Sequence, residues 1–405
     1  MKYKLYDHCR ISGSKELVEF LNFNTALAGG FHKSETSCSS EEKFPLTLSY
    51  CPTSNLVQVN EVINPEILFS EYFYKTGTIN TLVNHFNLLA GTVQKKLSPE
   101  SILEIGCNDF TFLRNFINLK TKVVGVDPSD ISKNNVPKGA VLYNDFFTYQ
   151  KSIEILKDNG TFDVIFSSNS FAHIEDIKDV VRGIKNLLSE NGVLIIEVHW
   201  LGSLIKNLQF PFIYHEHMYY YSLSALQFLL NQYNIRIFDV ENIDTHGGSI
   251  RIQASHFESN HQLTDNLETL IEIEKNIGLY ETKTFLDFGT KIEKAKKETL
   301  DLFSQIKKEN KIIVGYGASG QANTLMAVYG LTRDHISYIV DDSPIKIGCF
   351  TPNNCIPIVG SKTLLERPPN YIFCLAYTFI NEIIERNKEL SVKWIVPLPI
   401  LEIIE

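Results

Sequence analysis

The feature that most constrains the fold is a buried strand, a glycine turn, a helix and a second strand ending in an acid. It first occurs from Ser101 through Gly106 to Asp127, which lies 21 positions after the glycine. Apolar strands that alternate with helices predict a parallel, doubly wound sheet. An acid about 20 residues after a glycine turn is typical of sites that hold the ribose of a nucleotide.

The alternation continues beyond this unit. We expect a strand over 161–168, a helix over 177–189 and a strand over 192–198. Ligands of such sheets bind at the carboxyl ends of the strands. Residues at such ends are Gly106, Asp127, Asp145, Asn169 and His173. An isolated histidine is more often structural, but His173 follows Asn169 by four positions, and we expect both to line the site.

A second unit of the same kind lies near the C-terminus. Residues 311–324 fit Gly-x-Gly-x-x-Gly at Gly315, Gly317 and Gly320, and a strand then ends at Asp341 and Asp342. Backbone N–H groups at such a turn bind a pyrophosphate, which belongs either to NAD or to a nucleoside-diphosphate sugar. A charged helical pattern over 266–308 predicts a connecting helix pair, and residues 371–377 predict a further buried strand.

Between the two units stands Tyr214-His215-Glu216-His217, flanked by aromatic residues. An extended segment would turn Tyr214 and Glu216 to one face and the two histidines to the other. A histidine held by a carboxylate is a candidate general base near neutral pH. The alternative is a polar turn without a chemical role. The nearby stretch 245–251 is either a glycine-rich ligand contact or a plain domain junction.

The first 80 residues contain two Cys-x-x-Ser turns, Cys9 to Ser12 and Cys51 to Ser54. A zinc knuckle needs a second cysteine in each turn, and serine is a poor zinc ligand beside thiolate. We therefore expect no structural zinc, unless His8, His32 or Cys38 completes a site. A short strand is expected over 56–59 and a helix over 79–96. Tyr72 and Tyr74, just before that helix, either reach a neighbouring active site or pack against the next domain.

Composition excludes several classes of protein. A length of 405 residues predicts two or three domains. The net charge of −9 gives no basic footprint for nucleic acid. Neither a membrane span nor an apolar signal sequence is recognisable, so we expect a cytoplasmic protein. The seven cysteines are scattered and odd in number, which favours reduced thiols over a disulfide framework.

The first unit resembles class I S-adenosylmethionine (SAM)-dependent methyltransferases. Glu104-Ile105-Gly106 is like their first motif, Asp127 like the ribose acid, and Asp145-Phe146 like the adenine-contacting pair. By this resemblance the cofactor-binding residues are Glu104, Gly106, Asn108, Asp127, Asp145 and Phe146. Phe110 stands where a glycine is usual, and it either narrows the methionine end of the pocket or only repacks the core.

Taken in order, the motifs resemble the sugar C-methyltransferase family, which acts on nucleoside-diphosphate 4-keto-deoxysugars. The resemblance implies a knuckle domain over 1–80, a methyltransferase domain over 81–256 and a Rossmann-like sugar-nucleotide domain over 257–405. It implies catalytic roles for Asn169, His173, Tyr214, Glu216, His217 and Tyr74. The substrate-binding residues it implies are Tyr72, His246, Gly247, Arg251, Gly317, Ser319, Gly320 and Asn323.

The chemistry that this family implies is deprotonation next to a ketone. His217 is the expected base at C3, oriented by Glu216, with Tyr214, His173 and Asn169 donating to the enolate oxygen. SAM gives the methyl group, and the nucleotide, the sugar configuration and the oligomeric state stay open. The alternatives are an NAD-dependent sugar-nucleotide epimerase or dehydrogenase, and a binder of nucleotide sugars that has lost catalysis.

Overall fold

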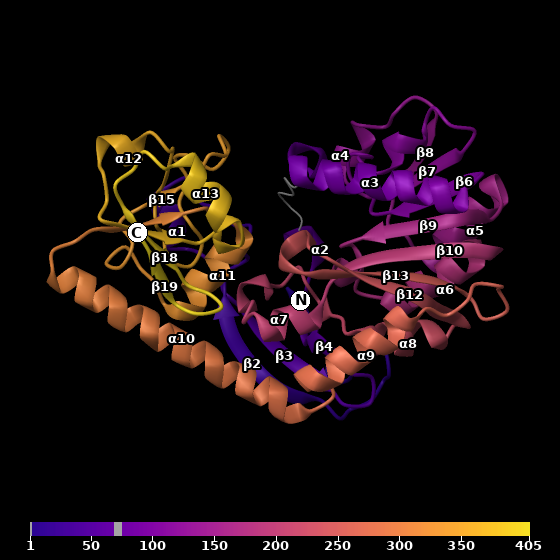
Figure 1. Ribbon diagram of the computed structural model, residues 1–405, viewed down its shortest axis with the longest axis horizontal. Coiled ribbons are helices and arrows are strands. Elements are labelled where there is room, and N and C mark those ends of the chain that lie inside the picture. The colour runs from indigo at the N-terminus through magenta and orange to yellow at the C-terminus, as the bar shows by residue number, and fades with distance from the viewer. Residues whose placement is uncertain (1, 69–74) are drawn as a thin grey trace.

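The computed structural model describes residues 2–68 and 75–405, and Figure 1 shows them in three parts. A seven-stranded sheet lies on the right, a six-stranded sheet on the left, and the N-terminal strands lie low between them. The two larger sheets follow the two strand–turn–helix units of the sequence, so the α/β class and the second Rossmann-like domain are confirmed.

The seven-stranded sheet has the order β12-β13-β10-β9-β6-β7-β8. Its strands are β6 (Ser101–Ile105), β7 (Lys122–Val126), β8 (Ala140–Tyr143), β9 (Phe162–Ser168), β10 (Leu188–His199), β12 (Ile235–Ile243) and β13 (Ser249–His256). Strands β6 to β10 pair in parallel, and β13 is antiparallel to both β10 and β12. Every residue of β6 is buried, as continuous apolar strands covered on both faces require.

Helices cover both faces of this sheet. They are α3 (Asn80–Leu97), α4 (Asp130–Lys133), α5 (Tyr149–Asn159), α6 (Ile177–Leu187), α7 (Leu201–Lys206) and α8 (Leu223–Asn231), with short 3₁₀ turns η2 (Leu113–Phe116), η3 (Phe171–His173), η4 (Phe210–Phe212) and η5 (Thr245–Gly247). In α6, for example, Asp176 caps the N-terminus by accepting from the Asp179 N–H at 3.1 Å. Residues 177, 180, 181, 184 and 187 then bury one face, as helical periodicity demands.

The N-terminal part forms a four-stranded sheet in the order β11-β4-β3-β2. The elements of this N-terminal part, within and outside that sheet, are β1 (Tyr3–Leu5), β2 (Val18–Thr25), α1 (Glu35–Cys38), β3 (Phe44–Cys51), β4 (Leu56–Val59), β5 (Glu61–Ile63), α2 (Pro65–Leu68) and η1 (Thr76–Thr78). Strand β11 (Tyr219–Tyr220) is contributed by the chain just after His217 and pairs antiparallel with β4. The histidine-rich turn is therefore fastened to the N-terminal sheet.

The C-terminal sheet has the order β16-β15-β14-β17-β18-β19. Its elements are β14 (Ile313–Tyr316), α11 (Gly320–Tyr329), β15 (Ile339–Val340), β16 (Ile358–Val359), α12 (Thr363–Glu366), β17 (Tyr371–Cys374), η6 (Tyr377–Phe379), α13 (Ile380–Arg386), β18 (Lys393–Val396) and β19 (Glu402–Ile404). The expected helix pair is present as α9 (Asp265–Ile277) and α10 (Thr282–Lys308), and Figure 1 shows α10 running beneath β2 toward this sheet.

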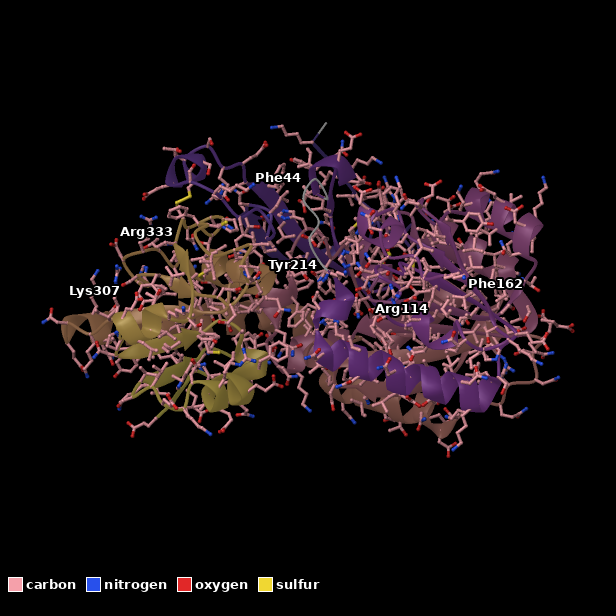
Figure 2. All side chains as sticks on the ribbon, turned by 90° about the horizontal axis from the view of Figure 1, so that it is seen from above. Phe44, Arg114, Phe162, Tyr214, Lys307 and Arg333 are labelled. Atoms are coloured by element: carbon pink, nitrogen blue, oxygen red, sulfur yellow. A yellow bond between two sulfur atoms is a disulfide. The ribbon has the colours of Figure 1, made fainter. Side chains whose placement is uncertain are left out.

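The cysteines differ from expectation at one pair. Cys38 and Cys355 form a disulfide between the N-terminal part and the C-terminal sheet domain, visible as a yellow bond near Arg333 in Figure 2. The prediction of reduced thiols is wrong for this pair, because the fold joins residues 317 positions apart. The free cysteines are Cys9, Cys51, Cys107, Cys349 and Cys374. Among the helices that the structure describes, none has the length and apolar character of a bilayer crossing.

Candidate active site

The glycine turn after β6 carries the expected nucleotide-type geometry. Gly106 has a φ of 78°, and a Cβ there would lie 2.1 Å from the Ser170 Oγ, so the turn requires glycine. The Asn108 N–H donates to the Asp127 Oδ2 at 2.9 Å, and the Ser129 N–H donates to the Asp127 Oδ1 at 2.8 Å. Asp127 is thereby fixed at the end of β7, beside the turn.

Phe110 belongs to the core behind this turn. It is fully buried, and its ring lies against Gly125 of β7, where a Cβ would come within 2.9 Å of the Phe110 Cε1. Its φ of 63° lies in the left-handed region, which explains why a glycine is usual at this position. Of the two roles left open by the sequence, the structure supports repacking of the core.

A fit for SAM can be tested on the carboxylates of this turn. Glu104 is 5% exposed, and its Oε2 has no hydrogen-bond partner among the described residues. Burial, followed by the charges of Asp127 and Asp109, raises the pKa of Glu104 well above its ordinary value. Within residues 2–68 and 75–405 these three carboxylates form no ion pair, and a sulfonium ligand that also carries an ammonium group would balance their charge. Asp145 and Phe146 follow β8, where Asp145 pairs with Lys151 at 3.1 Å and the Phe146 ring is exposed.

The segment 214–217 is a turn, which was one of the two conformations that the sequence left open. The His217 N–H donates to the Tyr214 carbonyl at 2.9 Å, which brings residues three positions apart side by side. The Tyr214 hydroxyl lies 2.9 Å from the His217 Nε2. The turn forms because the next residue, Met218, donates its N–H to the Ala172 carbonyl at 2.7 Å, and β11 then pairs with β4.

His217 is held in one tautomer. Its Nδ1 lies 2.9 Å from the Phe212 carbonyl, which can only accept, so the proton is on Nδ1 and the lone pair is on Nε2. Burial, reinforced by the nearby His173, lowers the pKa of His217 well below its ordinary value. The ring is therefore neutral at pH 7, as a general base must be.

Glu216 does not orient this ring, which corrects the expected role. Both His217 nitrogens are occupied, by the Phe212 carbonyl and the Tyr214 hydroxyl. The Glu216 carboxylate is instead close to Gly29. A Cβ placed on Gly29 would lie 3.8 Å from the Glu216 Oε1. Burial raises the pKa of Glu216 to about 7.

His173 lies at the other side of the His217 ring, with the two ring centroids 5.0 Å apart. The His173 ring donates to the Glu216 backbone carbonyl, and burial lowers the pKa of His173 to about 4. Asn169 begins the same segment at the end of β9, with its N–H on the Glu197 carbonyl at 2.8 Å. Because Ser170 faces Gly106, this segment runs from the glycine turn to the histidine pair.

His215 has a structural role. It is 1% exposed, its Nε2 donates to the Pro45 carbonyl at 3.1 Å, and its ring meets Phe44 edge-on. Burial lowers the pKa of His215 to about 4. The residue anchors the turn to β3.

The glycine-rich joint is placed next to the same region. Gln209, which the sequence reading missed, donates from its Nε2 to the Gly247 carbonyl at 2.7 Å and lies 3.0 Å from the His199 Nε2. His246 has a φ of 53°, and burial lowers the pKa of its ring. His246 and Gly247 therefore stay candidates for substrate contact.

Arg251 is a different case. Its Nη2 lies 2.7 Å from the Glu197 Oε1 and its Nη1 lies 2.9 Å from the Glu241 Oε2. His85, another residue without a sequence signal, also pairs with Glu197 at 2.9 Å. The guanidinium is neutralised by cross-strand partners, so this geometry assigns Arg251 to the cohesion of the sheet rather than to the substrate.

The second glycine turn has a cation that the motif alone did not indicate. Gly317 has a φ of 94°, and a Cβ there would lie 2.7 Å from the Ala376 Cβ. The Ala318 N–H donates to the Asp341 Oδ2 at 2.7 Å. The Lys346 Nζ donates to the Ala318 carbonyl at 2.6 Å and lies 3.6 Å from the Asp341 Oδ2. Lys346 lies in the stretch 341–348, which follows the predicted strand and begins with its two terminal acids. Attention to the whole of this stretch would have identified Lys346 from the sequence.

Two expected substrate contacts at this turn serve the protein itself. The Ser319 Oγ accepts from the Ala322 N–H at 3.1 Å and caps α11. Asn323 is fully buried, and its Nδ2 donates to the Ala28 carbonyl at 2.7 Å, so it cannot contact a ligand. Gly320 also packs on Ala28, because a Cβ placed on Gly320 would lie 3.4 Å from the Ala28 Cβ. Residues 28 and 29 thus lie between the second glycine turn and Glu216.

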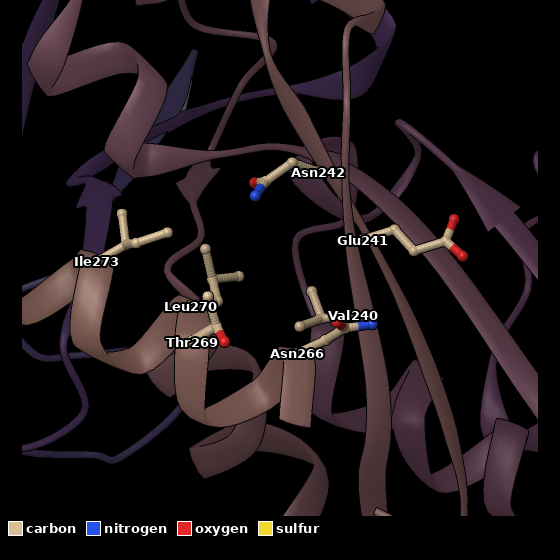
Figure 3. A pocket seen from close by; sticks show the side chains of 7 residues that line it. All are labelled: Val240, Glu241, Asn242, Asn266, Thr269, Leu270 and Ile273. Carbon is tan, nitrogen blue, oxygen red and sulfur yellow. The ribbon is translucent and has the colours of Figure 1, made fainter. Parts of the chain in front are cut away.

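Tyr214 lies near the middle of the molecule, where the three parts meet (Figure 2). Tyr72 and Tyr74 lie outside the described residues. A groove of about 260 Å³ lies elsewhere, between β12 and α9 (Figure 3). It is lined by Val240, Glu241, Asn242, Asn266, Thr269, Leu270 and Ile273, none of which is a candidate site residue.

Comparison with known proteins agrees with this three-part organisation. Three family models match in order: "Putative zinc binding domain" over residues 9–69, "Methyltransferase domain" over 82–240 and "C-methyltransferase C-terminal domain" over 244–399. The C-methyltransferase NovU of Streptomyces niveus is 29% identical over 408 residues, which cover 97% of this chain and 96% of NovU. The ubiquinone biosynthesis O-methyltransferase of Pelagibacter ubique is 29% identical over 124 residues, 29% of this chain and 49% of that protein.

Among solved structures, magnesium protoporphyrin IX methyltransferase from Synechocystis PCC 6803 is 12% identical, with a TM-score of 0.34 over 43% of this chain and 83% of that one. The glycine turn, its acid and the matching domain model define a class I SAM-dependent methyltransferase. The three models in succession, with an alignment over nearly the whole length of NovU, support a SAM-dependent C-methyltransferase. The NAD-dependent and non-catalytic alternatives are thereby displaced.

Proposed function

We propose that the enzyme methylates C3 of a nucleoside-diphosphate 4-keto-6-deoxysugar through an enolate, and so builds a branched deoxysugar. The observation that carries the proposal is the neutral His217, in contact with Tyr214 and His173, beside the segment that leads from Gly106. C-methylation needs a carbon nucleophile, and a proton next to a ketone is the one that a histidine near neutral pH can remove. We further propose functional domains over 1–80, 81–256 and 257–405.

In the proposed reaction, the His217 Nε2 takes the proton from C3, and the electron pair moves to the C4 oxygen as an enolate. We propose the Asn169 amide and, once it turns from the His217 Nε2, the Tyr214 hydroxyl as the donors to that oxygen. The His173 ring is neutral and its N–H is on the Glu216 carbonyl, so the donor role expected for it is not supported. Losing one such donor typically raises a barrier by about 2.7–4 kcal/mol.

The bound SAM supplies an electrophilic methyl group on its sulfonium. The proposed holders are Gly106, Asn108 and Asp127 at the turn, Glu104 beneath it, and Asp145 with Phe146 at the adenine end. The chemistry that SAM would supply there is transfer of this methyl group to the C3 carbanion, with S-adenosylhomocysteine as the leaving group. If base and methyl lie on opposite faces of the sugar, C3 is inverted.

The second glycine turn is the proposed diphosphate site. Backbone N–H groups at a helix N-terminus favour phosphate, and Lys346 adds a cation to the same turn. Residues 28 and 29 contact Gly320 on one side and approach Glu216 on the other, which supports a substrate that extends from this turn to His217. We propose that Tyr72 and Tyr74 complete the sugar end of the site.

The test is mass spectrometry of thymidine-, guanosine- and cytidine-diphosphate 4-keto-6-deoxysugars incubated with the enzyme and SAM in heavy water. The proposal predicts a product that has gained one methyl group, and deuterium at C3 of the remaining substrate. Deuterium without methyl transfer would place the enolate chemistry here but not the methyl donor. If neither label appeared with any of the three nucleotides, the proposed substrate class would be wrong.

A further inference from the structure

The two Cys-x-x-Ser turns of the N-terminal domain meet face to face. The Cys9 Sγ lies 3.2 Å from the Ser54 Oγ, and the Ser12 Oγ lies 3.5 Å from the Cys51 Sγ. Cys9 and Cys51 are fully buried, and Ser54 is 1% exposed. Each turn is also closed along its backbone, by Gly13 N–H to the Cys9 carbonyl at 2.7 Å and by Ser54 N–H to the Cys51 carbonyl at 3.3 Å. The four side chains have the arrangement of a zinc knuckle in which two thiols are replaced by hydroxyls.

This donor set does not fit the metal that the matching family model names. Structural zinc is held by four nitrogen or sulfur ligands, and the turns offer two. The three residues that might complete a site are engaged elsewhere. His8 binds Asp7 at 2.9 Å, His32 binds Glu41 at 2.7 Å, and Cys38 is in the disulfide with Cys355.

We propose that Cys9, Ser12, Cys51 and Ser54 form a metal-free, hydrogen-bonded cage. Its hydrogen bonds join the two turns in place of a zinc ion. The S–H and O–H groups satisfy one another in a buried site, where an unpaired polar group would be costly. The two turns thus keep the arrangement of a zinc knuckle but lack the two further thiols that zinc would need.

The cage supports the catalytic turn through Arg10, the residue after Cys9. Arg10 is 5% exposed, and its guanidinium lies 4.1 Å from the ring centre of Tyr219. Its Nη2 donates to the Val59 carbonyl at 2.9 Å and to the Met218 carbonyl at 2.7 Å. Met218 follows His217, so Arg10 is a positioning residue that connects the cage to the turn carrying the proposed base.

The test restores the missing thiols. The double variant Ser12→Cys/Ser54→Cys is expected to purify with about one zinc per chain, measured by mass spectrometry of the metal, because four converging thiols bind zinc tightly. A chelator should then lower its thermal midpoint. The wild type and the control variant Ser14→Cys, which lies outside the cage, should carry less than about a tenth of an equivalent and keep their midpoints in chelator.

Two results would overturn the proposal. One is a wild type that holds about one zinc per chain and loses thermal stability in chelator. The other is a folded double variant without zinc, which would mean that the four positions do not converge. If the double variant does not fold, the wild-type measurements and the variant Cys51→Ser decide. A cage of hydrogen bonds tolerates a fourth oxygen with a small change in midpoint and no metal released, whereas a zinc site would lose its metal.

Discussion

The two glycine turns of this enzyme are built with the same contact and differ in charge. In the seven-stranded sheet the Asn108 N–H meets the Asp127 carboxylate, and in the six-stranded sheet the Ala318 N–H meets the Asp341 carboxylate. Glu104 and Asp109 then add negative charge around the first turn, whereas Lys346 adds a cation to the second. Under the proposed function, one backbone device serves two ligands: a cationic methyl donor at the first turn and an anionic diphosphate at the second.

The sheets differ also in what their connections carry. Between β10 and β12 the first sheet contains the turn with Tyr214, Glu216 and His217. From β14 to β19 the second sheet has His335 as its one histidine, and its Nδ1 accepts from the Thr332 N–H at 3.1 Å. The proposed function thus assigns the chemistry to the connections of the first sheet and the binding of the nucleotide sugar to the second sheet.

Replacing His217 by asparagine should have the largest effect. Loss of a general base typically costs 10²–10⁴-fold, so methyl transfer and C3 exchange should both fall by about that factor. SAM affinity, measured by calorimetry, should not change. His261→Asn is the matched control, because this half-buried histidine contacts the Asn191 carbonyl and the Phe238 ring, away from the proposed site. Wild-type turnover in His217→Asn would remove the assignment.

Replacing Asp127 by asparagine should weaken SAM and leave the nucleotide sugar unaffected. A hydrogen bond to a charged group contributes about 1.5–3 kcal/mol, so an affinity loss of about tenfold or more is expected by calorimetry. Asp158→Asn on α5 controls for charge alone. An equal loss of affinity for both ligands would show that the two turns are not separate sites.

Lys346→Ala should do the reverse. We expect KM for the nucleotide sugar to rise about tenfold, with the SAM affinity unchanged, because one charged contact to the diphosphate is lost. Lys388→Ala, whose ammonium pairs with Glu385 on the surface of the same domain, should leave KM unaltered. A KM for Lys346→Ala equal to that of the control would separate the second turn from substrate binding.

The smallest effect concerns stability against pH. Burial lowers the pKa of His215 to about 4, below its ordinary value of 6.5, so between these values the unfolded chain binds more protons. The free energy of unfolding should therefore fall as the pH drops from 6.5 toward 4. His215 contributes at most about 1.4 kcal/mol for each pH unit. Denaturant titrations at pH 7 and pH 5 should show a stability difference that His215→Asn shifts toward greater relative stability at pH 5. The same difference in the wild type and in His215→Asn would contradict the burial argument.

Glu216 should act in the opposite direction. Its pKa is raised from 4.5 to about 7, so the folded state holds a proton that the unfolded state releases, and its contribution to stability declines as the pH rises through that range. Glu216→Gln should remove this decline, which the same titrations can detect between pH 5 and pH 8.

The sequence predicted those features that depend on neighbours along the chain. Both glycine turns and the strands before them follow from apolar runs and glycine spacing, and they are present. The helix expected after the second turn is α11, whereas only the 3₁₀ turn η2 (Leu113–Phe116) forms after the first, so that expectation was wrong. The positions of Asp127 and Asp341 follow from the length of one strand–helix–strand unit.

The features that were missed depend on contacts between distant segments. The turn at Tyr214 is set by Ala172 and by β4, Arg251 by a carboxylate on β10, and Asn323 by Ala28. Each local pattern permits the wrong reading, because an extended run, a free guanidinium and an exposed amide look the same in sequence. Tertiary pairing decides among them.

The most direct test of the account is the pH dependence of deuterium entry at C3 of the nucleotide sugar. If His217 is the base, its depressed pKa keeps the ring unprotonated, and exchange should stay at its plateau until the pH falls below the ordinary histidine value of 6.5. Burial raises the pKa of Glu216 to about 7. If the rate of deuterium exchange instead fell on the acidic side of that pH, and this fall were absent in Glu216→Gln, the base would be Glu216 and the account would be contradicted.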